Sequence, residues 1–242
     1  MTLDEILELV GPLDESAGEN TARDHATRPG KEEVAMKRWY VTTLGALVVF
    51  GIFGCAQMRM PFGGGGWTTL IDGASGLENW DRVGDANWRA EDGAIVADKG
   101  KGGYLVSKNS YKDFEIRAEF WVATDTNSGV FIRCDDPVKI GAATCYEVNI
   151  WDIRPDPKYA TGGIVDHAAV PVPLVHKAGG RWNTYEITAK GPQLTVKLNG
   201  VQTVSIQDAK HPAGPFALQY GAGVKGAQGG PIRWRKVQVR PL

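Results

Sequence analysis

The chain has 242 residues, with 27 Lys and Arg against 28 Asp and Glu, and 43% of its residues are hydrophobic. This composition excludes an intrinsically disordered chain, a collagen and a protein with many membrane spans. The formal net charge of −1 also argues against a general nucleic-acid binder, because such proteins carry a basic surplus.

The first 35 residues differ in charge from the rest of the chain. They hold nine acidic and three basic side chains, and prolines and glycines interrupt them. Such a polar segment cannot bury enough apolar surface to form a core. We therefore expect residues 1–35 to be a disordered acidic extension, and Met36 to be the natural start of the chain.

Residues 36–55 (MKRWYVTTLGALVVFGIFGC) combine a basic start, a short apolar run and small residues before a cysteine. The uncharged run at 39–54 has 16 residues, fewer than the roughly 20 that a membrane-spanning helix needs. The pattern is typical of a secretory signal peptide, with an uncleaved signal anchor as the alternative.

The end of this segment, Ile52 to Cys55, resembles the lipobox of bacterial lipoproteins, in which the cysteine is lipidated. The sequence thus predicts export to the periplasm or cell envelope and a lipid anchor on the membrane through Cys55. Residues 56–66 then include four consecutive glycines, which predict a flexible tether. The globular domain is expected at 67–242.

From Trp67 onward, short runs alternate between apolar and polar residues with period 2, and no long helical stripe interrupts them. Asp92-Gly93 and Asn199-Gly200 each separate two such runs and suit hairpin turns, which need positive φ. About a dozen short strands predict an all-β sandwich or barrel. Further strands are expected at 104–107, 113–123, 128–134, 146–152, 182–189, 215–220 and 231–240.

The alternation also predicts which side chains point outward. If the strands at 113–123, 128–134 and 146–152 are neighbours, their outward side chains form one face that mixes charges with aromatic rings. Charged groups bond sugar hydroxyls and flat rings stack on sugar C–H groups, so this face fits a saccharide site. A ladder of cross-strand salt bridges is the alternative. The face would hold Glu115, Arg117, Glu119, Trp121, Phe131, Arg133, Glu147, Asn149 and Trp151.

A long irregular segment at 153–181 contains Asp156, Asp166, His167 and His176. Loops of this length are usually functional or disordered, and a histidine beside a sheet can act as a base, bind a metal or simply lie on the surface. The two cysteines of the globular part, Cys134 and Cys145, lack zinc-site spacing. They form either a disulfide, as an exported protein allows, or two free thiols.

An ordered set of motifs resembles the 3-keto-disaccharide hydrolase family over residues 67–242. The motifs are WTTLIDGASGLENW (67–80), NSGVFIR (127–133), YEVNIWD (146–152), TGGIV (161–165), GGRWNTYEITAKGPQLTVKLNG (179–200) and IRWRKVQVRPL (232–242).

The resemblance implies a concanavalin-like jelly roll of two antiparallel sheets, and cleavage of glycosides oxidised at carbon 3. The matching site positions are Arg133, Glu147, Asp152 and Asn183, and Asn127 of the NSG motif joins them as a substrate-binding residue. The chain departs from the family at Asn149, where glutamine is common, and at 165, where tyrosine is common.

A 3-keto group acidifies the hydrogen on carbon 2, so a base can remove it, the glycosidic oxygen can leave, and water can add back. Glu147 is the expected base, with His167 as the alternative, and Arg133 would stabilise the enolate. No cofactor is certain, but a divalent metal held by Glu147, Asp152 and His167 would serve the same purpose.

Three functions remain open on this reading. They are an exported hydrolase or lyase of 3-keto-glycosides, a non-catalytic carbohydrate-binding module on the same fold, and a purely structural envelope lipoprotein. The partner of the first two is a saccharide. The first also implies a separate sugar 3-oxidoreductase that makes the substrate.

Overall fold

The computed structural model describes residues 66–242. The expected acidic extension, the signal peptide with Cys55 and all but the last residue of the tether lie outside the described residues. Within residues 66–242, no helix has the length and apolar character needed to cross a bilayer.

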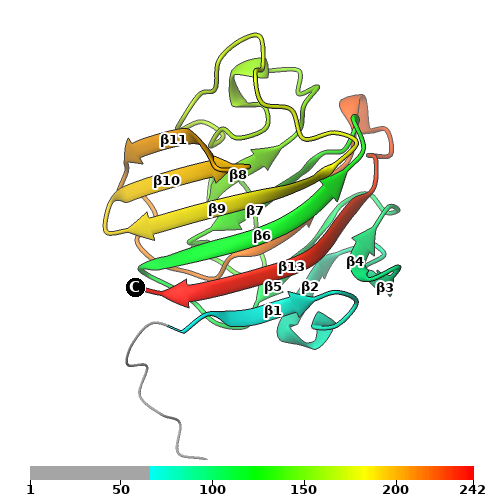
Figure 1. The fold of residues 1–242 in the computed structure, drawn as a ribbon, viewed down its shortest axis with the longest axis horizontal. Helices are drawn as coiled ribbons and strands as arrows, with labels where there is room; N and C mark the ends of the chain where they lie inside the picture. The colour runs from blue at the N-terminus through cyan, green and yellow to red at the C-terminus, as the bar shows by residue number, and fades with distance from the viewer. Residues whose placement is uncertain (1–65) are drawn as a thin grey trace, which may run out of the picture. The chain divides into compact units, whose positions relative to one another are not determined.

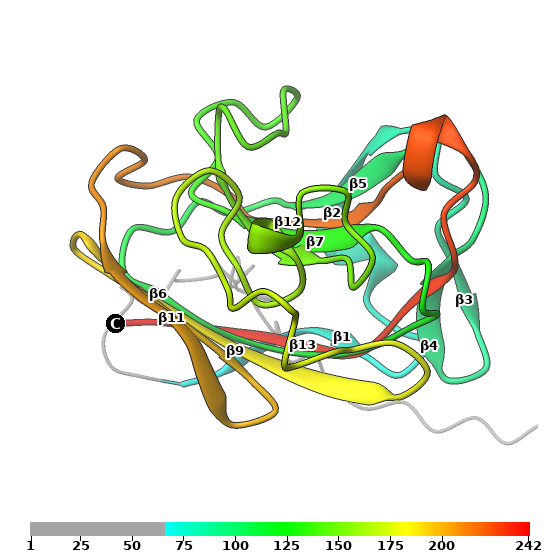
Figure 2. The same cartoon turned by 90° about the horizontal axis from the view of Figure 1, so that it is seen from above.

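Two antiparallel β-sheets pack face to face, as Figures 1 and 2 show from two directions. In the eight-stranded sheet, β13 is central, because it pairs with β6 on one side and with β1 and β4 on the other. The strands in spatial order are β11 (Val201–Gln207), β10 (Gln193–Leu198), β9 (Trp182–Lys190), β6 (Phe114–Val122), β13 (Ile232–Pro241), β4 (Ala94–Ala97) and β3 (Arg89–Glu91), with β1 (Thr68–Asp72) beside β13.

The second sheet has five strands and lies behind the first in Figure 1. Three short 3-10 segments, η2 (Leu77–Asn79), η3 (Pro157–Tyr159) and η4 (Val224–Gly226), lie in connections. The predicted all-β jelly roll of two antiparallel sheets is confirmed. The strands of the second sheet in spatial order are β2 (Trp80–Gly84), β5 (Gly103–Ser107), β12 (Ala217–Tyr220), β7 (Ser128–Ile132) and β8 (Tyr146–Ile150).

The period-2 pattern correctly predicts which side chains enter the core. On β6, the apolar set from Phe114 to Val122 is buried, while the alternate residues are partly or fully exposed. Trp234 of β13 is also fully buried against the ring of Phe120. Both predicted hairpin turns are present, and Asp92, Gly93, Asn199 and Gly200 all have positive φ.

The expectation that the strands at 113–123, 128–134 and 146–152 are neighbours is confirmed for the last two and wrong for the first. β6 belongs to the eight-stranded sheet and pairs with β9 and β13, whereas β7 and β8 pair in the five-stranded sheet. Alternation fixes which side of a strand faces the core, but strands of both sheets obey it equally. The expected single face is therefore divided between the two outer surfaces of the sandwich.

The disulfide between Cys134 and Cys145 is present. It closes the loop between β7 and β8. Both cysteines pack with Phe131 and Val106 in a small apolar cluster on the outer side of the five-stranded sheet. The cross-link fixes the chain immediately before β8.

Arg133 joins the two sheets. It follows β7, is 1% exposed, and has a positive φ of 52°. Its guanidinium donates to the carbonyls of Lys112, just before β6, and Gly191, in the turn between β9 and β10. Asp113 lies 3.3 Å from the same group and also accepts the Gly191 N–H. Because these bonds use the guanidinium inside the protein, Arg133 holds the sandwich together and does not face solvent with Glu147.

Replacing Arg133 with methionine is expected to lower the free energy of unfolding by about 2–4 kcal/mol, because buried carbonyls and Asp113 would lose their donor. Urea denaturation of the two proteins measures the difference. The matched control is Arg82→Met, at an exposed arginine of the edge strand β2, with an expected change of about 0.5 kcal/mol or less. Equal stabilities of wild type and Arg133→Met would contradict the conclusion that Arg133 holds the two sheets together.

Candidate active site on the five-stranded sheet

A row of directly paired residues crosses the outer surface of the five-stranded sheet and ends at Glu147. From β8 inward, Glu147 pairs with Phe131, Phe131 with Ala217, Ala217 with Val106, and Val106 with Asp81. The middle of this row is apolar and buried. The carboxylate therefore stands at one end of an apolar strip.

The neighbouring outward row is polar. Tyr104 of β5 pairs with Gln219 of β12, and Gly129 of β7 pairs with Asn149 of β8. The edge of the Tyr104 ring packs against Phe131, and Gln219 Nε2 lies 3.5 Å from the Tyr104 hydroxyl.

Gly129 leaves a gap in this polar row. A Cβ there would lie 3.1 Å from the Val148 carbonyl and 3.6 Å from Gln219 Oε1. Its φ is not in the left-handed region, so the glycine is required for space and not for backbone conformation. The absent side chain lets the Phe131 ring, the Gln219 amide and the Val148 carbonyl lie close together at this point.

Glu147 is 8% exposed. Burial raises the pKa of its carboxyl group to about 7, against the opposing effect of Arg154 and with a smaller contribution from Asp166. No ion pair within 4.0 Å joins Glu147 to Arg154 in the part of the chain that the structure describes. A carboxyl group with this pKa can accept or donate a proton near neutral pH.

Several buried polar side-chain atoms on this surface, and in the loop that follows β8, have no hydrogen-bond partner among residues 66–242. They come from β8, from β12 and from the loop that follows β8. Buried polar atoms are nearly always paired, with protein or with water, so these atoms are available to water or to a ligand. The atoms are Asn149 Oδ1, Gln219 Oε1, Trp151 Nε1 and Arg154 Nε.

The long loop reaches this site because residues 162–165 extend the sheet. Gly162 and Val165 donate to the carbonyls of Asn149 and Glu147, and Asn149 donates back to Gly163. The segment thus covers the free edge of β8, and Asp166 follows it with a φ of 63°. The TGGIV motif is therefore not a strand but a turn-rich segment that pairs with β8 through an isolated bridge between Ile164 and Val148.

Asp152 holds both ends of this loop. Its carboxylate accepts the N–H groups of Ala178 and Gly179 and the hydroxyl of Thr161. These bonds use it as a structural anchor at the end of β8.

His167 lies apart from Glu147. Its Nδ1 is 2.7 Å from Asp208 Oδ2, and its ring packs edge-on against Tyr146, whose hydroxyl donates to the other oxygen of Asp208. Burial alone would raise the pKa of Asp208, but the bonds from Tyr146, the Lys210 N–H and His167 lower it to about 2. Tyr146 points to the opposite side of β8 from Glu147. His167, the alternative base, packs against Tyr146 and therefore does not lie beside Glu147.

The predicted metal ligands do not come together. Asp152 is bonded to the loop and His167 to Asp208, and no group of three His, Cys, Asp or Glu side chains within residues 66–242 is arranged to hold a metal ion. Glu147, Asp152 and His167 therefore do not form the expected site for a divalent metal ion.

The remaining predicted substrate-binding residues lie elsewhere. Asn183 is 2% exposed and donates to the Ala178 and Arg181 carbonyls, and Asn127 donates to the Ala222 carbonyl, so both stabilise local backbone. Trp151 stays near the site, with the Arg154 guanidinium 5.8 Å from its ring. The residues of β6, namely Glu115, Arg117, Glu119 and Trp121, lie on the outer side of the other sheet.

Sequence reasoning missed Arg154, Tyr104 and Gln219. The last two come from strands distant in sequence, and only the sheet order places them beside β7 and β8. Arg154 lies two residues after Asp152, the last residue of YEVNIWD. This short distance in sequence from the motif was the one available signal for Arg154.

The family model for the 3-keto-alpha-glucoside-1,2-lyase-like domain matches residues 66–240, and the chain belongs to this family. A curated relative from Bacteroides thetaiotaomicron, named 3-keto-disaccharide hydrolase, is 28% identical over 162 residues. That match covers 54% of this chain and 55% of the relative, so the chain spans about half of the relative's length.

Two solved structures of candidate glycosyl hydrolases from Parabacteroides distasonis share the fold. One has a TM-score of 0.58 and 24% identity, and the match covers 74% of this chain and 100% of that one. The other has a TM-score of 0.59 and 18% identity, with 73% and 94% covered.

The raised pKa of Glu147 predicts a pH-dependent stability. A carboxyl group whose pKa rises from 4.5 to about 7 on folding stabilises the fold below pH 4.5, and this contribution is lost as the pH rises through 7. The Glu147→Gln side chain cannot ionise, so the variant does not lose stability in this way. At pH 8 it is expected to be about 2–3 kcal/mol more stable than wild type, and at pH 4.5 the two stabilities are expected to be nearly equal. Urea denaturation at both pH values tests this, and a stability difference that does not change with pH would contradict it.

Proposed function

We propose that this domain cleaves the glycosidic bond of 3-keto-glycosides by elimination followed by hydration, with Glu147 as the base. The observation that carries the proposal is the buried carboxyl group of Glu147, with a pKa of about 7, at the end of an apolar strip. Buried polar atoms of the same surface and of the following loop have no partner within residues 66–242. Membership of the family supplies the substrate class.

In the first step, the Glu147 carboxylate takes the proton from carbon 2, and the electron pair forms the C1–C2 double bond as the C1–O bond breaks. The leaving oxygen takes a proton from a water molecule and departs as the free alcohol. The hydroxide left from that water then adds to carbon 1, and Glu147 returns its proton to carbon 2. The net reaction consumes one water and regenerates the carboxylate.

Arg154 stabilises the negative charge that this reaction generates. Negative charge develops on the 3-keto oxygen as the proton leaves, and a nearby cation stabilises it. A cation also makes a carboxylate a weaker base, but burial of Glu147 outweighs Arg154. Arg154 thus takes the role that the sequence assigned to Arg133.

The chemistry requires a reaction that supplies the substrate. An ordinary glycoside lacks the carbonyl group that acidifies carbon 2, so an oxidation at carbon 3 must come before this step.

Glu147→Gln is expected to lower the turnover of a 3-keto-glucoside by about a thousandfold, because the amide cannot accept the proton, while the variant still binds the sugar. Release of the aglycone measures turnover, with unoxidised glucosides as substrate controls and Glu119→Gln, on the opposite surface, as the variant control. In wild type, kcat should rise with pH to a plateau above about 7. A folded wild type that binds sugars but releases no aglycone from any 3-keto form would favour the carbohydrate-binding module.

Arg154→Ala is expected to lower kcat by about a hundredfold and to change KM much less, because the charge that it stabilises is absent from the ground state. Arg154→Lys should recover part of the rate. Arg181→Ala removes an exposed guanidinium from the end of the same loop and serves as the control. Equal kcat values for Arg154→Ala and Arg181→Ala would remove Arg154 from the mechanism.

A further inference from the structure

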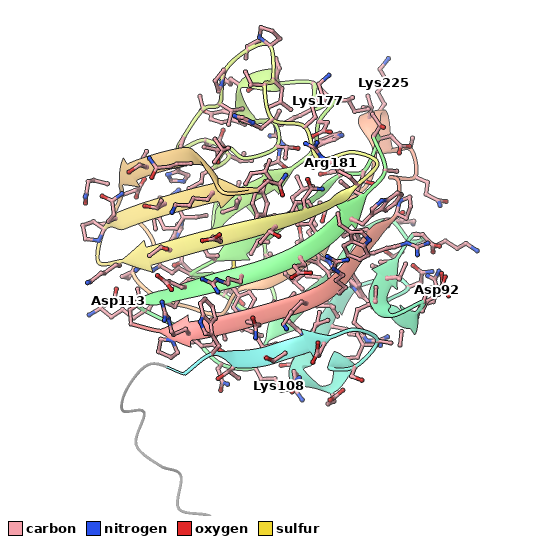
Figure 3. The ribbon with its side chains drawn as sticks, viewed as in Figure 1. Asp92, Lys108, Asp113, Lys177, Arg181 and Lys225 are labelled. Atoms are coloured by element: carbon pink, nitrogen blue, oxygen red, sulfur yellow. A yellow bond between two sulfur atoms is a disulfide. The ribbon has the colours of Figure 1, made fainter. Side chains whose placement is uncertain are left out.

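The outer surface of the eight-stranded sheet, which faces the viewer in Figures 1 and 3, carries a surplus of positive charge. Seven basic and three acidic side chains point outward from β6, β9, β10 and β13. Residues 66–242 as a whole carry 21 basic and 19 acidic side chains. The positive charge of the described domain is therefore concentrated on this one surface, away from Glu147.

Tryptophan rings hold several of these arginines in place. The guanidinium groups of Arg117 and Arg240 lie 4.7 and 4.8 Å from the ring of Trp67, and that of Arg235 lies 4.3 Å from Trp182. Stacking on a ring orients a guanidinium group and leaves its N–H edge open to a ligand. Arg240 is paired with Glu115 and Arg235 with Glu119, but no carboxylate of the described chain forms an ion pair with Arg117.

A groove of about 150 Å³ is lined by Arg117, Arg240 and the Trp67 ring between them. On its floor Arg117 of β6 pairs with Glu186 of β9, and Glu186 pairs with Lys197 of β10. The hydroxyls of Thr188 and Thr195, which are also cross-strand partners, line the same groove. The groove thus presents cations, carboxylates and hydroxyls within one small volume.

We propose that this surface binds an acidic polysaccharide, with Arg117 and Lys197 taking its anionic groups and the glutamates and threonines bonding its hydroxyls. A ligand with sparse negative charges among many hydroxyls matches this mixture. A nucleic-acid backbone or an anionic membrane carries denser charge, and Glu115 and Glu186 would repel it. The anionic group can be a carboxylate or a sulfate.

The test is retardation in native gels that contain polygalacturonate for carboxylate, a sparsely substituted dextran sulfate for sulfate, or dextran as the neutral parent of the latter. Retardation by at least one charged polymer and none by dextran is expected. Lys197→Glu should weaken binding about tenfold, because the exchange reverses one charge at the contact. The control is Lys225→Glu, whose side chain extends away from the sheets in Figure 3 and which should bind like wild type.

Absence of retardation by either charged polymer would overturn the proposal, as would equal losses in Lys197→Glu and Lys225→Glu. Tighter binding of duplex DNA or of phosphatidylglycerol vesicles than of both polymers would also overturn it. Glu147→Gln should bind the polymers as wild type does, so this result and the outcome for the catalytic proposal are independent.

Discussion

The arrangement of the candidate site depends on the carboxylate of Asp152. By accepting bonds from Thr161, Ala178 and Gly179, it ties the start of a long loop to its end. This anchoring lets residues 162–165 continue the sheet at the edge of β8, and the same loop carries Arg154 and Asp166 to the neighbourhood of Glu147. A loop rich in proline and glycine is thereby given a fixed position by a few bonds to one side chain.

The buried carboxyl group of Glu147 has the pKa that the proposed reaction needs, at a cost to the stability of the fold. Burial keeps Glu147 protonated well above the usual range of a glutamate, and the protein gives up stability at neutral pH to ionise it. An arginine placed close enough to form an ion pair would relieve this cost and also lower the pKa. Arg154 influences Glu147 without pairing with it, which leaves both groups available to a ligand. The proposed reaction needs this balance.

The sequence predicts the fold better than the site. Alternation on β6, β7 and β8 correctly separates inward from outward side chains, because one face of each strand must be buried. It cannot assign a strand to a sheet, since β6 finds its partners at 182–190 and 232–241, far along the chain. Glu147 was identified from its motif, but the roles expected of Arg133 and His167 depend on contacts with Gly191 and Asp208, which no local pattern reveals.

Gly129 has a consequence for the range of molecules that the five-stranded sheet can accept. Its missing side chain is the lowest point of the polar row, between Gln219 and Asn149, and even a methyl group would press on the Val148 carbonyl. At this point of the row the backbone itself therefore limits how closely a ligand can approach the sheet, and no change of a neighbouring side chain can lower that limit. Variation in ligand size within this architecture must come from the loops at the rim, and the sheet beneath sets a common depth.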